Sequence, residues 1–267
     1  MSFILSNVHT HTDFCDGTDS MEEMVKTAVE KGFDTLGFSF HSYVHFDKEN
    51  CIRNYPAYIE EFSRVRALYK DKINLLNGVE LDFYGERPEH SDYVIGSVHY
   101  FKKDGEFYPV DYSLKRFASV VKDVFAGEVI KSVELYYEEL ADMINTLKPD
   151  IVGHFDLITR FNKNSRFFDE NSDEYKKVLN RTMYKIPDGI TAEINLGRLF
   201  KREGDIYPSE YIIGLLKEKS CRFMLSSDAH RKEALGFKFG ETAERLKNLG
   251  IKSLCAYSGS KIEDFDI

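Results

Sequence analysis

The chain has 267 residues, of which 36 are basic and 45 are acidic, so its formal net charge at pH 7 is −9. An acidic chain argues against a nucleic-acid surface, because phosphate backbones are bound mainly by clustered Lys and Arg side chains. The length suits one α/β barrel of about 250 residues, and we expect a single domain over residues 1–267. No stretch approaches the roughly 18 apolar residues of a membrane span, so we expect a cytoplasmic protein.

Apolar runs alternate with segments of helical periodicity, as is typical of parallel strands joined by helices. The first helix is the clearest, because Ser20 and Glu23 form a capping box and Gly32 stands at its end. Strands are predicted at 8–10, 35–40, 73–81, 93–98, 151–154, 190–195, 221–226 and 252–256. Helices are predicted at 56–69, 114–125, 131–147, 173–184, 209–219 and 242–249. These elements make about seven or eight units of a barrel or wound sheet.

Residues 101–149 form a longer connection than two strands need. The Asp104-Gly105 pair predicts a small hairpin at its start, and we expect this segment to form a lid or wall over the site. The four cysteines are widely spaced and form no C-x-x-C pair, which predicts reduced thiols rather than a zinc knuckle or a disulfide framework.

Two pairs of residues near the chain's ends have the spacing of metal ligands. His9 and His11 lie two apart in a predicted strand, so both imidazoles face the same side. Asp228 and His230 repeat this spacing after a later strand. A single H-x-H motif is weak, since nearby histidines are often ordinary surface or core residues. Two such pairs at strand ends favour a metal site.

Further candidate ligands follow other predicted strands, namely Asp16, His41, Glu80, His99 and His154. The carboxyl ends of parallel strands meet at one face, so these residues can converge there. Six of the eight histidines lie at such positions, and only His45 and His90 do not. A set of core histidines would leave Asp16, Glu80 and Asp228 without partners, although buried carboxylates need them.

The nine candidates exceed the ligand number of one ion, so two or three divalent ions are expected. Imidazole and carboxylate ligands without thiolate favour Zn, Mn or Fe over Mg or Ca. The acidic chain would also need bound cations to attract a phosphate ester.

Together these motifs resemble those of the polymerase and histidinol phosphatase (PHP) superfamily, and within it the monofunctional histidinol-phosphate phosphatases. The matching segments are H-T-H-T at 9–12, Asp-Gly at 16–17, Gly-x-Glu at 78–80, Ser-x-His at 97–99, Gly-His at 153–154 and Ser-Asp-x-His at 227–230. The resemblance implies a distorted TIM-like (β/α)7 barrel with a trinuclear metal centre at the C-terminal face of its strands.

By analogy with the family, one ion would lie among His9, His11, Glu80 and Asp228. A second would lie among Glu80, His99 and His154, and a third among Asp16, His41 and His230. Glu80, Asp228 and His230 are therefore predicted to be catalytic as well as metal-binding. One departure concerns His41, because the chain has Phe40 where the family usually has an acidic residue. A metal-bound imidazole normally donates its second N–H to an acceptor, so this change bears on how His41 is oriented.

Arg160 and Arg198 lie a few residues beyond strand ends and are candidates for clamping a phosphate, although an ordinary salt bridge explains each nearly as well. Glu193 and Asn195 share one face of a strand, and either orient ligands, contact the substrate amine or pack in the core. No residue stands out as the acid that protonates the leaving group.

The resemblance implies hydrolysis of L-histidinol phosphate to L-histidinol and phosphate, a late step of histidine biosynthesis, by attack of a metal-bridging hydroxide on phosphorus. The small-molecule ester could instead be a phosphotyrosyl, nucleotide or sugar phosphate. An amidohydrolase also begins with H-x-H but commonly uses a bridging lysine where this chain has Glu80. A non-catalytic metal-binding module is a further alternative.

Overall fold

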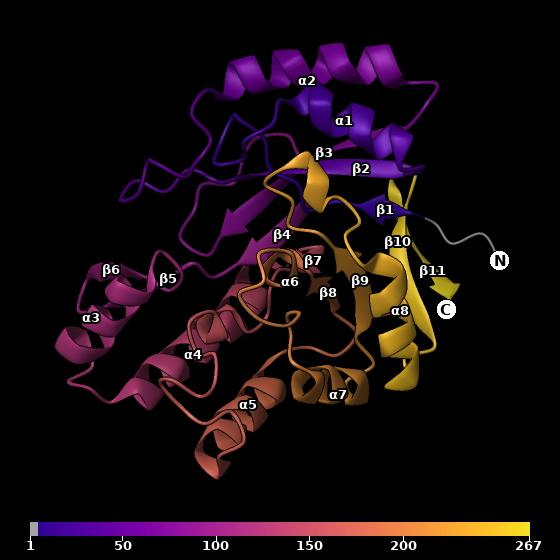
Figure 1. The fold of residues 1–267 in the computed structure, drawn as a ribbon. Helices are drawn as coiled ribbons and strands as arrows, with labels where there is room; N and C mark the ends of the chain where they lie inside the picture. Colours follow the sequence, from indigo (N-terminus) through magenta and orange to yellow (C-terminus); the bar gives the residue numbers. More distant parts are fainter. Residues whose placement is uncertain (1–4) are drawn as a thin grey trace.

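A seven-stranded parallel sheet curls into a barrel in the computed structural model, which describes residues 5–267 (Figure 1). The strand order is β1-β2-β3-β4-β7-β8-β9, and every neighbouring pair is parallel. The strands are β1 (Ser6–Asn7), β2 (Thr35–His41), β3 (Asn74–Asp82), β4 (Tyr93–Ser97), β7 (Ile151–Val152), β8 (Thr191–Asn195) and β9 (Arg222–Ser226). The predicted distorted TIM-like (β/α)7 barrel is therefore confirmed.

The barrel closes between its first and last strands, near their carboxyl ends. Thr10 and Ala229 form a parallel bridge there, and the amide of His11 donates to the carbonyl of Ala229 at 2.9 Å. The fully buried side chain of Asn7 reinforces the closure. Its Oδ1 accepts from the amide of Ser227 at 2.7 Å, and its Nδ2 donates to Thr10 Oγ1 at 2.6 Å. The two segments that carry paired metal-ligand candidates are thereby brought into contact.

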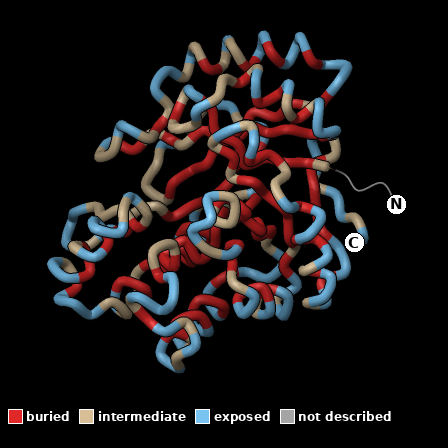
Figure 2. The backbone as a smooth tube through the Cα atoms, in the orientation of Figure 1, coloured by how far each residue is buried: buried red, intermediate tan, exposed pale blue. Residues whose placement is uncertain are grey.

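Helices cover the outside of the barrel, with their buried faces toward the strands and their exposed faces toward solvent (Figure 2). In α1 the predicted capping box is present, since Ser20 and Glu23 exchange side-chain to backbone hydrogen bonds. The helices are α1 (Met21–Glu30), α2 (Tyr55–Tyr69), α3 (Leu114–Val124), α4 (Val129–Leu147), α5 (Asp173–Lys185), α6 (Gly197–Phe200), α7 (Glu210–Glu218), α8 (Phe239–Asn248) and the 3-10 turns η1 (Leu157–Thr159) and η2 (Lys232–Ala234). Most connections between strands thus run through helices, as a parallel sheet requires.

A second apolar cluster forms the floor beneath the carboxyl ends of the strands. Strand side chains alternate between the helix layer and the barrel interior, so Leu75 packs with the helices whereas Leu76 joins this inner cluster. The ring of Tyr93 crosses the interior here, and a Cβ at Gly37 or Gly78 would overlap it. Glycine at 78, two residues before Glu80, therefore makes room for the aromatic floor under the predicted metal site.

Two antiparallel hairpins lie outside the barrel sheet. The predicted hairpin at Asp104-Gly105 is present as β5 (Tyr100–Lys103) and β6 (Glu106–Pro109). The strand predicted at 252–256 is present as β10 (Ser253–Ser258), but it pairs with β11 (Lys261–Asp266) and adds no eighth unit to the barrel. The four cysteines are free and buried. Over residues 5–267 no helix combines the length and the apolar character needed to cross a membrane; residues 1–4 of the short apolar N-terminal stretch lie outside the described range.

Replacing the closing residue tests how much the β1 to β9 contact contributes to stability. Asn7→Ala leaves the buried amide of Ser227 without its side-chain acceptor, and we expect the free energy of unfolding to fall by about 2–3 kcal/mol. Denaturant unfolding measures the change. Asn248→Ala, at the exposed end of α8, is the matched control and should change stability by less than about 0.5 kcal/mol. Equal stability of both variants would contradict the role given to Asn7.

Candidate metal centre

All nine predicted ligands lie together at the carboxyl ends of the barrel strands. The acidic residues and histidines come from loops after β1, β4, β7 and β9, from the ends of β2 and β3, and from the loop before α1. Three overlapping groups have side-chain N and O atoms within 4.8 Å of one another. They are His11, Asp16, His41 and His230; His9, His11 and Glu80; and His41, Glu80 and His99.

Glu80 lies at the middle of the cluster and is almost fully buried. Its Oε1 is 2.8 Å from His154 Nε2 and 3.2 Å from His99 Nε2. Its Oε2 is 3.0 Å from His41 Nδ1 and 3.1 Å from His9 Nε2. Both carboxylate oxygens therefore face imidazoles on different sides, as a ligand shared between two ions would.

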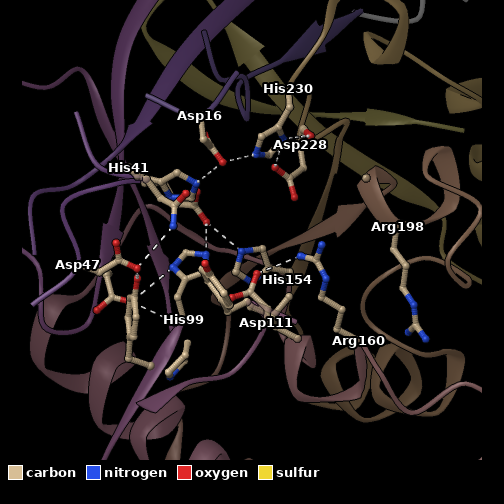
Figure 3. A pocket seen from close by; sticks show the side chains of 18 of the residues that line it. Asp16, His41, Asp47, His99, Asp111, His154, Arg160, Arg198, Asp228 and His230 are labelled. Carbon is tan, nitrogen blue, oxygen red and sulfur yellow. Dashed lines mark hydrogen bonds and ion pairs between the residues drawn. The ribbon is translucent and has the colours of Figure 1, made fainter. Parts of the chain in front are cut away.

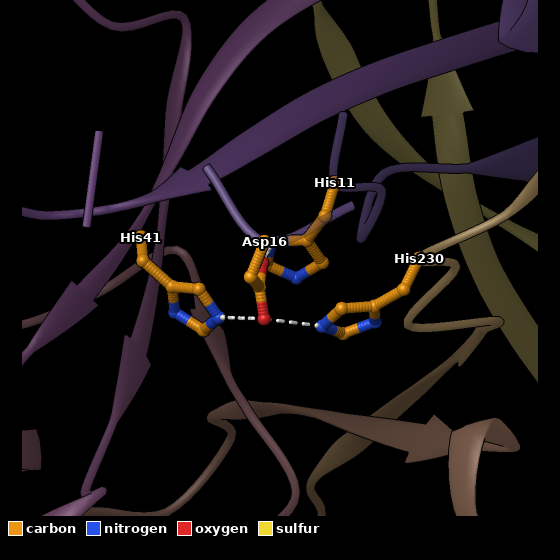
Figure 4. Close-up of side chains that lie close together, drawn as sticks. All are labelled: His11, Asp16, His41 and His230. Carbon is orange, nitrogen blue, oxygen red and sulfur yellow. Dashed lines mark hydrogen bonds and ion pairs between the residues drawn. The ribbon is translucent and has the colours of Figure 1, made fainter. Parts of the chain in front are cut away.

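The opposite side of the cluster is formed by the residues after β9 and by Asp16 (Figure 4). Asp16 Oδ2 lies 2.9 Å from His230 Nε2 and 3.5 Å from His41 Nε2. Asp228 Oδ1 lies 3.3 Å from His11 Nε2. The geometric groups differ from the family-based sets, since His11 and His41 each belong to two groups, and His41 takes the place of His154 beside Glu80 and His99.

Several atoms in this cluster are suited to bind cations because they are buried and lack hydrogen bonds. His9 Nε2, His11 Nε2, Asp16 Oδ1 and Glu80 Oε2 are all of this kind. Leaving a buried polar atom without a partner costs about 1–3 kcal/mol, so such atoms rarely gather by chance. The donor set of imidazole and carboxylate fits divalent transition-metal ions.

The pKa shifts of the clustered residues in the protein without metal also fit a site for cations. Burial would raise the pKa of Glu80, but the imidazoles of His9, His41 and His99 hold it well below its usual range. Burial lowers the pKa of His11 to about 4, and the neighbouring His230 and His41 act in the same direction. For His9, burial lowers the pKa, but Glu193, Glu80 and Asp228 together raise it well above its usual value. Protons on some imidazoles thus balance the carboxylates, and metal binding would displace them.

A second layer of hydrogen bonds orients the candidate ligands. Glu193 Oε2 lies 2.7 Å from His9 Nδ1, and its Oε1 accepts from the His154 amide and from Asn195 Nδ2, each at 2.7 Å. Asn195 also donates to Asp228 Oδ2 at 3.2 Å. Glu193 and Asn195 therefore contact candidate ligands. Neither residue is among the described residues that line the pocket. Of the roles predicted for this pair, the orientation of ligands fits the geometry.

No site role was predicted for two polar neighbours of the candidate ligands, Asp82 and Ser97. Asp82 Oδ2 accepts from the amide of His99 at 3.0 Å and lies 3.4 Å from its Nδ1. Ser97 Oγ donates to Glu80 Oε1 at 2.8 Å. The two-residue spacing of Asp82 from Glu80 on one strand is the signal that could have found it.

The Phe40 position does not face the metal centre. Its side chain is buried and packs against the rings of Tyr55 and Tyr58, with centroids 5.6 and 4.8 Å away. Alternation along β2 turns His41 to the opposite side, where it meets Asp16 and Glu80. Contacts with these two ligands, rather than with residue 40, therefore fix the orientation of His41.

A pocket of about 290 Å³ opens over the cluster (Figure 3). Arg160 and Arg198 both line it, and the Nε atom of each is buried without a hydrogen bond. Arg160 Nη1 donates to Asp111 Oδ2 at 3.0 Å, whereas Arg198 Nη1 donates to Thr159 Oγ1 at 3.3 Å. This volume lies near the lower end of small-molecule sites, which favours a compact ligand over a peptide.

The PHP domain family model matches residues 7–196 of the chain, well over half of its length. The chain is 26% identical to a probable histidinol-phosphatase of Schizosaccharomyces pombe, over 92% of this chain and 87% of that protein. It is 24% identical to a histidinol-phosphatase of Bacillus subtilis, over 89% of this chain and 97% of that protein.

Two solved structures share the fold. A putative histidinol phosphatase from Listeria monocytogenes matches with a TM-score of 0.73 and 23% identity, covering 88% of this chain and 99% of that one. A histidinol phosphate phosphatase from Lactococcus lactis, solved with zinc, L-histidinol and phosphate, matches with a TM-score of 0.71 and 19% identity. The match covers 98% of this chain and all of that one.

Substituting Glu193 tests the second layer without removing a ligand. Glu193→Gln weakens the acceptor of the His9 ring, so we expect a 10- to 100-fold loss of zinc affinity. Competition with a chelator of known affinity measures the effect. Glu210→Gln, on the exposed side of α7, serves as the control and should keep the original affinity. Unchanged zinc affinity in Glu193→Gln would contradict the role given to this carboxylate.

Proposed function

Because this chain belongs to the PHP domain family, we propose that it is a metal-dependent phosphatase that hydrolyses L-histidinol phosphate to L-histidinol and phosphate. The observation that carries the proposal is the convergence of nine imidazole and carboxylate side chains, several with unpartnered buried atoms, under a pocket that contains two arginines. The substrate follows from relatives named as histidinol-phosphatases over nearly their whole length. The chain would act as one domain over residues 1–267.

The proposed ligands are the nine residues predicted from the sequence, with two or three ions of Zn, Mn or Fe. When bound, such ions supply an acidified water and offset charge on the phosphoryl oxygens. Glu80 would be shared by two of the ligand sets, because imidazoles from four strand ends surround its carboxylate. Asp16, Asp228 and His230 would complete the side of the site farthest from His99.

Arg160 and Arg198 would bind the phosphate. Their guanidinium groups carry permanent positive charge and present several N–H donors in a planar fork that matches phosphate oxygens. Both side chains line the pocket, and the Nε atom of each has no hydrogen-bond partner in the protein. Asp111 and Glu203 lie beside Arg160 and fix its position before a phosphate arrives.

Turnover tests the proposal directly. Metal-loaded protein should release phosphate from L-histidinol phosphate efficiently, and His9→Ala should lower kcat/KM at least about 100-fold, because an interior ligand is lost. A generic aryl phosphate is the comparison substrate. Equal or better turnover of aryl, nucleotide or sugar esters would mean that the substrate is wrong. No turnover by metal-loaded protein would favour the non-catalytic module.

The phosphate-binding role of the arginines gives a separate expectation. Arg160→Ala and Arg198→Ala should each raise KM about 10-fold or more, because a charge-assisted contact with the phosphate contributes about 1.5–3 kcal/mol. Steady-state kinetics on L-histidinol phosphate measure KM and kcat. Arg66→Ala, on the exposed face of α2, is the control. Unchanged kinetics in the first two variants would end this assignment.

A further inference from the structure

Helix α4 contains one buried acidic side chain that the metal centre does not use. Glu139 is 6% exposed and lies among apolar residues of the helix. Its Oε1 accepts two hydrogen bonds, from Tyr84 Oη and from the amide of Lys102, both at 2.8 Å. Its Oε2 is buried and has no hydrogen-bond partner. One oxygen thus joins the turn after β3 to strand β5, while the other is unsatisfied.

Both segments held by Glu139 lead to His99. The amide of Tyr84 donates to Asp82 Oδ1 at 2.9 Å, and Asp82 Oδ2 accepts from the amide of His99 at 3.0 Å. Lys102 lies in β5, which follows His99 directly, and the amide of Val110 at the end of the hairpin donates to the His99 carbonyl at 2.8 Å. We name residues 82–84 together with 99–110 the His99 wall. Tyr100, Asp111 and Tyr112, in or next to this wall, line the pocket.

We propose that Glu139 is a positioning residue that fixes the His99 wall to helix α4, and that it does so most tightly in its protonated form. The catalytic meaning of this wall rests on the proposed function, because His99 is a proposed metal ligand. The attachment itself does not rest on the proposed function, since it consists of hydrogen bonds from the turn after β3 and from strand β5 to helix α4.

The hydrogen-bond geometry favours the protonated form. A carboxylate in a buried position needs donors on both oxygens, but only Oε1 has them. A proton on Oε2 removes the charge and leaves both bonds to Oε1 intact. When the wall separates from the helix, water reaches the carboxyl group and the charged form is no longer penalised.

Around Glu139, burial and the neighbouring carboxylates outweigh the hydrogen bonds that favour the charged form. Burial raises its pKa, the bonds from the Lys102 amide and Tyr84 lower it, and the carboxylates of Asp82 on β3 and Asp142 on α4 raise it, to about 7. The Lys102 ammonium does not neutralise it by contact, since it lies over the ring of Phe107, 5.2 Å from the centroid.

The sign of the pH dependence follows from proton linkage. The attached wall gives Glu139 a pKa of about 7, whereas in the separated, hydrated state we expect the ordinary value of about 4.5. Between these values the attached state binds more protons, so raising the pH favours separation. From pH 6 to pH 8.5 the equilibrium constant for separation should rise about tenfold.

Hydrogen exchange of the hairpin amides tests this in the zinc-loaded protein, with zinc content assayed at each pH. Protection factors for residues 100–109, corrected for intrinsic exchange rates, should fall about tenfold from pH 6 to pH 8.5. Glu139→Gln keeps an acceptor oxygen but cannot ionise, so its protection should change less than twofold. Glu138→Gln, on the exposed face of the same helix, should behave like the unsubstituted protein.

Tyr84→Phe provides a second test if Glu139→Gln does not fold. It removes a donor that stabilises the charged carboxylate, so the midpoint of the loss of protection should move to higher pH. Protection that does not change with pH, or a pH dependence that persists in Glu139→Gln, would overturn the proposal. Because exchange needs no substrate, either result is independent of whether L-histidinol phosphate is hydrolysed.

Discussion

The burial of Glu80 is the constraint on which the rest of the site depends. Five imidazole nitrogens, from His9, His11, His41, His99 and His154, lie within 3.4 Å of its two oxygens. An isolated carboxylate at such a position would be neutralised rather than remain charged. Its pKa is nevertheless held well below its usual range, because the imidazoles outweigh burial. The centre is therefore stable only when positive charge, as protons or as metal ions, surrounds this residue.

The barrel places these imidazoles around Glu80 by bringing the strand ends together. Its interior side chains fill the space below them. Closure through Asn7 and Ala229 holds the first and last ligand pairs in one place. Beneath Glu80, the ring of Tyr93 occupies the space left by Gly37 and Gly78. The cluster thus has an apolar floor, and its access to solvent is through the pocket above it. Low access to water strengthens the electrostatic interactions within the cluster.

Local sequence patterns predicted the parts of this arrangement that depend on few residues. The capping box at Ser20, most of the parallel strands and the gathering of histidines and carboxylates at strand ends follow from local patterns, and the structure contains them. The first strand is an exception, since it covers Ser6–Asn7 rather than the predicted 8–10. The number of barrel strands was harder to predict from the sequence. Residues 252–256 have the pattern of a strand but pair only with the antiparallel strand β11. Asn7, Asp82 and Glu139 were not predicted. Their roles depend on partners far away in sequence, such as Ser227 for Asn7 and Lys102 for Glu139.

The electrostatics of the centre also explain how an acidic protein can attract a phosphate ester. The whole chain has a net charge of −9, and the ligand set includes only three carboxylates, those of Asp16, Glu80 and Asp228. Those three contribute three negative charges, whereas two or three divalent ions would contribute four or six positive ones. Counted over the ions and their ligands alone, the loaded centre would then be net positive, beside two arginines and within a protein that otherwise repels anions. Field lines from such a site are concentrated in its pocket, so the positive charge that balances Glu80 would also draw in a phosphate dianion.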